Sequence, residues 1–136
     1  MHVRRAIAVA SIGALTLLSA CGGDSGGVGV TLADFSVTPD ENSASAGDVT
    51  FDVTNDAEQS HEFVVIKTDL AEDQLPLDDE GVDESADGVE VVDEIEDVGG
   101  GSEQSLTVNL DAGSYVLICN LPGHYAQGMH AAFTVS

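Results

Sequence analysis

Short apolar runs separated by turn signals are the feature that most constrains the fold of this chain. Residues 49–54 and 105–110 alternate between apolar and polar side chains, which predicts strands with one buried face. Continuous apolar runs predict a strand buried on both faces at 63–66 and a central strand at 115–118, and 131–135 predicts a last strand. Several short strands at this spacing indicate a β-sandwich, and a chain of 136 residues has room for one domain.

The first twenty residues do not belong to this pattern. Arg4 and Arg5 form a positively charged start, and residues 6–18 form an apolar run that ends in small side chains. The apolar run is too short for a membrane-spanning helix, so residues 1–20 are predicted to be a signal peptide.

The tetrapeptide at residues 18–21, Leu-Ser-Ala-Cys, resembles the lipobox of bacterial lipoproteins. The resemblance implies that Cys21 is lipidated and becomes the first residue of a mature chain anchored to a membrane of the cell envelope, outside the cytoplasm. Residues 21–29 have the glycine-rich composition of a linker, which leaves 30–136 as the domain. The alternative is a plain secretion signal that happens to end beside a cysteine.

The chain after Cys21 is strongly acidic. It contains all 25 Asp and Glu residues and one basic residue, Lys67, so its net charge is −24. Such a surface excludes binding to nucleic acids or anionic lipids by electrostatics. Two interpretations stay open: a heavily solvated surface of the kind adapted to high salinity, or a surface that attracts a basic protein partner. Fourteen of the acidic residues lie in residues 69–97, which are predicted to be an excursion on the domain surface. Within it, 71–75 favours a helical turn and 89–95 a short strand.

Chemistry is concentrated in one stretch between the last two predicted strands. Cys119, His124 and Met129 supply a thiolate, an imidazole and a thioether within eleven residues, and His61 begins an apolar strand far upstream. Two His, one Cys and a weak axial Met form the ligand set of blue-copper sites. Thiolate and thioether favour Cu(I), while imidazole accepts either oxidation state. A structural zinc site is the main rival, but such sites rarely use a thioether.

On these residues the chain resembles the cupredoxin superfamily, and more closely its small plastocyanin/azurin-like and sulfocyanin-like members from prokaryotes, over residues 30–136. The resemblance implies a Greek-key β-sandwich with one type 1 copper ion at one end, held by His61, Cys119, His124 and Met129. Two departures stand out. Met129 lies one residue further along the loop than in azurins, and Glu62 stands where many relatives have Asn.

The expected function is electron transfer. Four protein ligands leave no open position for a substrate, so the chain is not expected to be an enzyme. We expect a monomer that carries single electrons between membrane-associated redox proteins, such as a cytochrome or an oxidase. The alternative is copper storage or delivery in the envelope, although the chain has no methionine-rich or histidine-rich tract.

Overall fold

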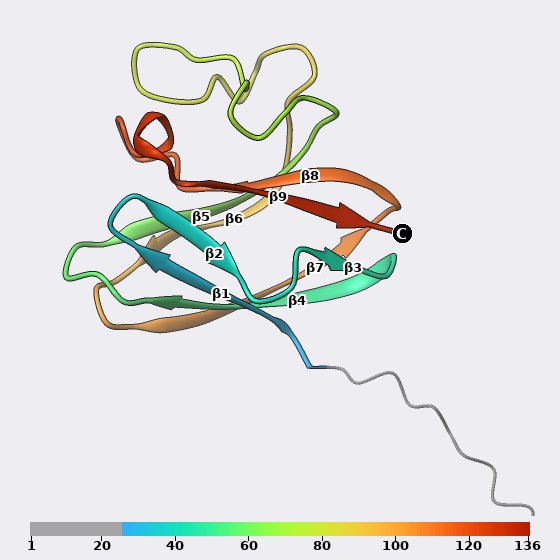
Figure 1. The fold of residues 1–136 in the computed structure, drawn as a ribbon, viewed down its shortest axis with the longest axis horizontal. Helices are drawn as coiled ribbons and strands as arrows, with labels where there is room; N and C mark the ends of the chain where they lie inside the picture. Colours follow the sequence, from blue (N-terminus) through green and yellow to red (C-terminus); the bar gives the residue numbers. More distant parts are fainter. Residues whose placement is uncertain (1–25) are drawn as a thin grey trace, which may run out of the picture.

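The computed structural model describes residues 26–136, which form two packed β-sheets (Figure 1). One sheet has four strands in the order β2-β1-β4-β7, and the other has five in the order β3-β9-β8-β5-β6. The elements are β1 (Val28–Ala33), β2 (Ser36–Pro39), β3 (Ser43–Ala44), β4 (Gly47–Asn55), β5 (His61–Lys67), β6 (Glu90–Val98), β7 (Glu103–Leu110), β8 (Gly113–Ile118), the 3₁₀ turn η1 (Tyr125–Gln127) and β9 (His130–Val135). The predicted all-β sandwich is confirmed.

The chain passes between the sheets five times, at β2 to β3, β3 to β4, β4 to β5, β6 to β7 and β7 to β8, as in Greek-key sandwiches. The predicted signal peptide, Cys21 and most of the predicted linker lie outside the described residues. The first strand begins at Val28 and so includes the last two residues of that predicted linker. It begins there because Val28 and Val30 are buried and pair with Phe51 and Val53 of β4. Within residues 26–136, no helix is long and apolar enough to cross a membrane.

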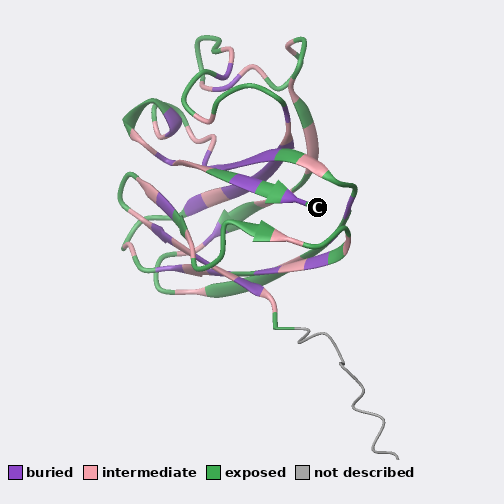
Figure 2. Cartoon of the chain, turned by 45° about the vertical axis from the view of Figure 1, so that its right-hand side comes forward, coloured by how far each residue is buried: buried purple, intermediate pink, exposed green. Residues whose placement is uncertain are grey.

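The alternating strands build the main core between the sheets. Phe51 of β4 is fully buried, and its ring centroid lies 5.4 Å from that of Phe63 and 5.3 Å from that of Phe133. These two partners come from β5 and β9 of the opposite sheet. Figure 2 shows the buried stretches along the strands, while exposed stretches dominate the loops. Three of the four phenylalanines of the chain therefore pack against one another between the two sheets.

The five-stranded sheet has a second, outer core. Phe63 and Val65 face the main core, whereas Val64 and Ile66 face outward and are equally buried. They are covered by residues 68–89, the outer loop, which inserts Leu75 and Val82 into this second cluster. Burial on both faces explains the continuous apolar run at 63–66.

The predicted structure of the acidic segment needs two corrections. The helical turn expected at 71–75 is absent. This stretch forms a non-helical turn, in which the backbone amide of Gln74 donates a hydrogen bond to the Ala71 carbonyl oxygen at 2.9 Å. The short strand expected at 89–95 is instead the nine-residue β6, whose pairing with β5 extends it to Val98. The excursion is therefore confined to the outer loop.

Candidate metal centre

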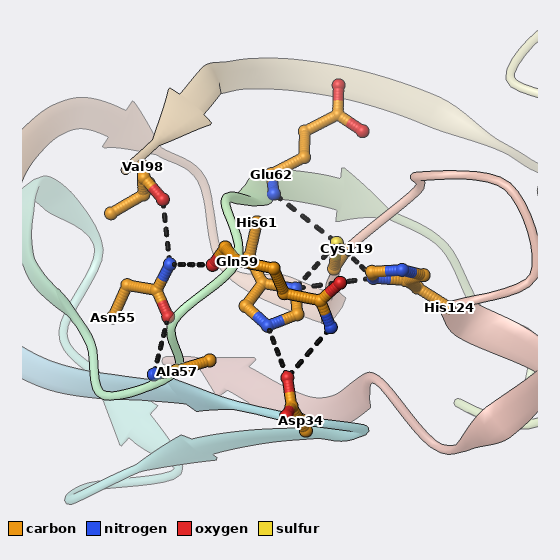
Figure 3. A network of polar contacts seen from close by, with 9 residues as sticks. All are labelled: Asp34, Asn55, Ala57, Gln59, His61, Glu62, Val98, Cys119 and His124. Atoms are coloured by element: carbon orange, nitrogen blue, oxygen red, sulfur yellow. Dashed lines mark hydrogen bonds and ion pairs between the residues drawn. The ribbon is translucent and has the colours of Figure 1, made fainter. Parts of the chain in front are cut away.

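Three of the predicted ligands meet at one end of the sandwich (Figure 3). His61 Nδ1 lies 3.8 Å from Cys119 Sγ, His124 Nδ1 lies 3.5 Å from the same sulfur, and the two Nδ1 atoms are 3.2 Å apart. His61 and Cys119 are fully buried, while His124 is partly exposed. The three ligand atoms lie within 4.8 Å of one another. Three lone-pair donors therefore converge on one small volume.

Residues 119–129, the ligand loop, connect β8 to β9 and are closed by backbone hydrogen bonds. The Cys119 amide donates to the Met129 carbonyl oxygen at 3.2 Å, and the Met129 amide donates to the His124 carbonyl oxygen at 3.2 Å. Gly128 adopts φ 116°, a left-handed conformation that a side chain would strain, and so allows the loop to return. Met129 is fully buried and is held beside Cys119. The loop thus places the backbone of Met129 next to that of Cys119, with both side chains buried in the main core.

Asn55 fixes the turn that delivers His61. Its side-chain amide donates to the carbonyl oxygens of Gln59 and Val98, both at 2.8 Å, and its Oδ1 accepts from the Ala57 amide at 2.9 Å. Asn55 is fully buried, and all three bonds are drawn in Figure 3. Because two of the bonds close the turn on itself and the third ties its start to β6, His61 enters β5 at a fixed position.

The far side of the His61 ring meets a carboxylate that the sequence did not point to. His61 Nε2 lies 3.5 Å from Asp34 Oδ1, and the same oxygen accepts a hydrogen bond from Gln59 Nε2 at 2.8 Å. The contact at Nε2 leaves Nδ1 facing the sulfur. Burial lowers the pKa of His61, the neighbouring His124 lowers it further, and Asp34 partly opposes both. A neutral imidazole is the form that binds a metal.

The sulfur of Cys119 is both buried and hydrogen-bonded. The Glu62 amide donates to Sγ at 3.3 Å. Burial raises the pKa of the thiol, and the amides of Leu121 and Glu62 partly oppose that shift. The thiol is therefore protonated at neutral pH unless a cation takes the place of the proton. Only the backbone of Glu62 is needed here, and its side chain points away from the sulfur in Figure 3, so glutamate at this position leaves the bond intact.

Two further side chains lie at the edge of the site. Phe35, at the tip of the β1–β2 hairpin, has φ 63° and is 44% exposed, and its ring stands edge-on to His124 with centroids 6.0 Å apart. His130 directly follows Met129 in the chain. Its Nδ1 lies 3.7 Å from Glu72 Oε2 and its ring packs on Tyr125, so it faces the outer loop. Nothing in the sequence near Phe35 marked it.

The residues present fit one copper ion. A buried thiol and two imidazoles converge, and a buried thioether is on the same loop. Soft sulfur ligands together with imidazoles suit copper in both of its common oxidation states. The predicted cofactor, one type 1 copper, is borne out by this donor set and by the family match reported below.

Solved structures similar to this chain include auracyanins and rusticyanin. A reduced auracyanin from Roseiflexus castenholzii is 21% identical over 79% of this chain and 94% of its own, with a TM-score of 0.58. Auracyanin A from Chloroflexus aurantiacus, described as a "blue" copper protein, is 22% identical over 79% and 99% of the two chains, with a TM-score of 0.53. Reduced rusticyanin is 22% identical over 79% and 78%, with a TM-score of 0.53. These likenesses support the cupredoxin-like fold.

Sequence comparison gives the family. Among curated proteins, no sequence relative matches the chain. Residues 25–136 match the family of copper binding proteins described as plastocyanin/azurin. That match covers the whole sandwich and all four predicted ligands, and it agrees with the ligand geometry. The chain belongs to the plastocyanin/azurin family of copper-binding proteins.

Proposed function

We propose that this protein carries single electrons between redox proteins of the cell envelope. The observation that carries the proposal is the convergence of buried His61 and Cys119 with partly exposed His124, on elements fixed by backbone hydrogen bonds. Copper, when bound, supplies one-electron chemistry. The protein keeps the donor atoms in place, so little rearrangement accompanies a change of oxidation state.

The burial of the ligand cluster favours electron transfer over a reaction on a bound substrate. His61, Cys119 and Met129 have no exposed surface, so water reaches the ligand cluster chiefly on the His124 side. Asp34 and the Glu62 amide hold the imidazole and the sulfur from outside the cluster. A closed set of four side chains offers no position for a substrate, which supports a carrier over an enzyme.

Reversibility tests this function against copper storage or delivery. We expect the copper-loaded protein to pass through repeated cycles of reduction and oxidation with its metal content unchanged. A delivery protein would instead lose Cu(I) to a chelator soon after reduction. Metal analysis after each cycle distinguishes the two, and loss of copper on the first reduction would contradict the carrier function.

The exposed edge of His124 is proposed as the place where electrons enter and leave. The Phe35 ring contacts His124, and Pro122 and Ala126 each lie two residues from it in the chain. All three are exposed and uncharged in a chain whose net charge after Cys21 is −24. An uncharged patch beside a partly exposed ligand suits close contact with a partner. The acidic residues nearby would attract a basic partner from a distance, in a salt-dependent way.

Ala126→Glu is expected to slow electron transfer to a small basic cytochrome at every ionic strength, because the new carboxylate must be desolvated at the contact. Ala112→Glu is the matched control. It adds the same charge at an exposed position beside the start of β8, the end of that strand remote from Cys119. Stopped-flow rates measure both. Equal rates for the two variants, with the copper spectrum intact, would place the contact elsewhere.

The predicted lipid anchor on Cys21 completes the proposal. An anchored carrier stays near membrane-bound donors and acceptors, which is an advantage for a protein that works between them. Cys21→Ser is expected to move the protein from the membrane fraction to the soluble fraction, and membrane retention of the variant would refute the anchor.

A further inference from the structure

Hydrogen bonds join the outer loop to the ligand loop at two places, and each place is next to a predicted copper ligand. Asn120 directly follows Cys119, and Tyr125 directly follows His124. Both side chains turn away from the metal centre toward the outer loop and form hydrogen bonds with its backbone. In Figure 1 the outer loop, green to yellow, lies over the same end of the sheet as the orange-red ligand loop.

Tyr125 makes the first attachment. Its hydroxyl accepts a hydrogen bond from the Leu75 amide at 3.0 Å and donates one to the Glu72 carbonyl oxygen at 2.7 Å. The side chain is 5% exposed and belongs to the second core with Leu75 and Val82. One buried hydroxyl therefore satisfies two backbone groups of the outer loop, and apolar contacts hold the ring that bears it.

Asn120 makes the second attachment. Its Oδ1 accepts from the Val82 amide at 2.7 Å, and its Nδ2 donates to the Val82 carbonyl oxygen at 3.1 Å and to Glu84 at 2.9 Å. The side chain thus pairs with both polar groups of one residue, as a neighbouring strand would. Gly81 permits this approach, because a Cβ there would come within 2.5 Å of Asn120 Oδ1.

We propose that the outer loop positions the copper ligands, with Asn120 and Tyr125 as positioning residues. This inference rests on the proposed function, since it concerns how the same site is held. Cu(II) favours a tetragonal arrangement of ligands that Cu(I) does not need. A ligand loop held at the residues after Cys119 and His124 resists movement toward that arrangement. The acidic excursion then contributes to the rigidity of the site as well as to the surface charge.

Tyr125→Phe tests the proposal because it removes one oxygen and keeps the ring. Without the hydroxyl, the Leu75 amide loses its partner, and the attachment beside His124 is weakened. We expect copper to be lost to a chelator about tenfold faster, the factor that corresponds to about 1.4 kcal/mol. We also expect a lower reduction potential, because a looser loop accommodates Cu(II) better.

Tyr115→Phe is the matched control. Tyr115 is also buried, 3% exposed, and its hydroxyl also donates to a backbone carbonyl oxygen, that of Asp111 at 2.8 Å. It lies in β8 but bonds to the turn before that strand, away from the ligand loop. We expect this variant to lose thermal stability while keeping the copper release rate and the potential of the unmodified protein. Equal changes in both variants would overturn the proposal.

Amide hydrogen exchange of the full-length metal-free protein provides a readout that does not depend on copper. We expect Tyr125→Phe, and independently Asn120→Ala, to raise exchange selectively at residues 119–129, whereas Tyr115→Phe does not. Unchanged exchange in that loop would contradict the positioning role even if the protein cycles electrons well. Failure of reversible cycling in the unmodified protein would instead contradict the proposed function and leave the exchange result valid.

Discussion

Cys119→Ser is expected to abolish the intense visible colour of the copper-loaded protein and most of its copper affinity. The colour of type 1 sites comes from charge transfer between thiolate and copper, and a serine hydroxyl supplies neither the soft donor nor the charge. Because Cys119 is fully buried and no other thiol lies in residues 26–136, no neighbouring sulfur can replace it. Visible absorption and the copper content after dialysis measure the effect.

Cys21→Ser is the control for that experiment. It removes the other cysteine of the chain and should leave the colour and the copper content unchanged. Retained colour in Cys119→Ser would show that the thiolate is not a ligand. Stoichiometric zinc in the native protein, with no coloured copper form, would contradict the copper site altogether.

Asn55→Ala is expected to cost about 3 kcal/mol of unfolding free energy, since a buried polar group left without its partner costs about 1–3 kcal/mol. The side chain makes three hydrogen bonds, and the Val98 carbonyl oxygen that it satisfies is itself buried. Such a loss is large against a total stability of about 5–15 kcal/mol. Copper affinity should also fall, because the turn that carries His61 becomes free to move.

Asn109→Ala is the control for this second prediction. Asn109 is exposed and makes one side-chain hydrogen bond, to exposed Asp48 at 2.8 Å. Its replacement should change the stability by less than about 0.5 kcal/mol, as is usual for surface sites. Denaturant unfolding of the metal-free proteins measures both variants. A loss at Asn55 no larger than that at Asn109 would mean that the turn holds itself without this side chain.

The ligand loop and the sandwich could be predicted because their signals are local. Cys119, His124 and Met129 lie within eleven residues between two apolar strands, and alternation in 49–54 directly marks a face that packs inward. His61 was accessible because it begins a continuous apolar run. Family resemblance then joined it to the loop, and the structure places its Nδ1 3.8 Å from the sulfur.

Asp34 and Phe35 could not be predicted because their role depends on strand pairing. Their turn reaches the site only because β1 pairs with β2 and β4, which carries the hairpin tip alongside the ligand loop. Charge alone did not distinguish Asp34 from the other 24 acidic residues. Neither side chain has a local pattern that points to a metal centre.

The packing of the outer loop against the sheet could not be predicted from the composition of the loop. Leu75 and Val82 are isolated apolar residues among carboxylates, and such a segment reads as solvated surface. The available signal lay elsewhere, in the unbroken apolar runs at 63–66 and 115–118. Two central strands that are apolar on both sides require a cover on each side, and the outer loop is the segment that supplies the second cover.

The direction of β1 sets how the molecule would stand on a surface. The strand starts at Val28 and ends one residue before Asp34, which contacts His61, so its six residues separate the two ends by about 20 Å. A tether at Cys21, as proposed, would hold the end where the strand begins. The His124 edge would then lie on the side of the domain opposite the tether and point away from the lipid. There it would meet the soluble or protruding parts of its partners.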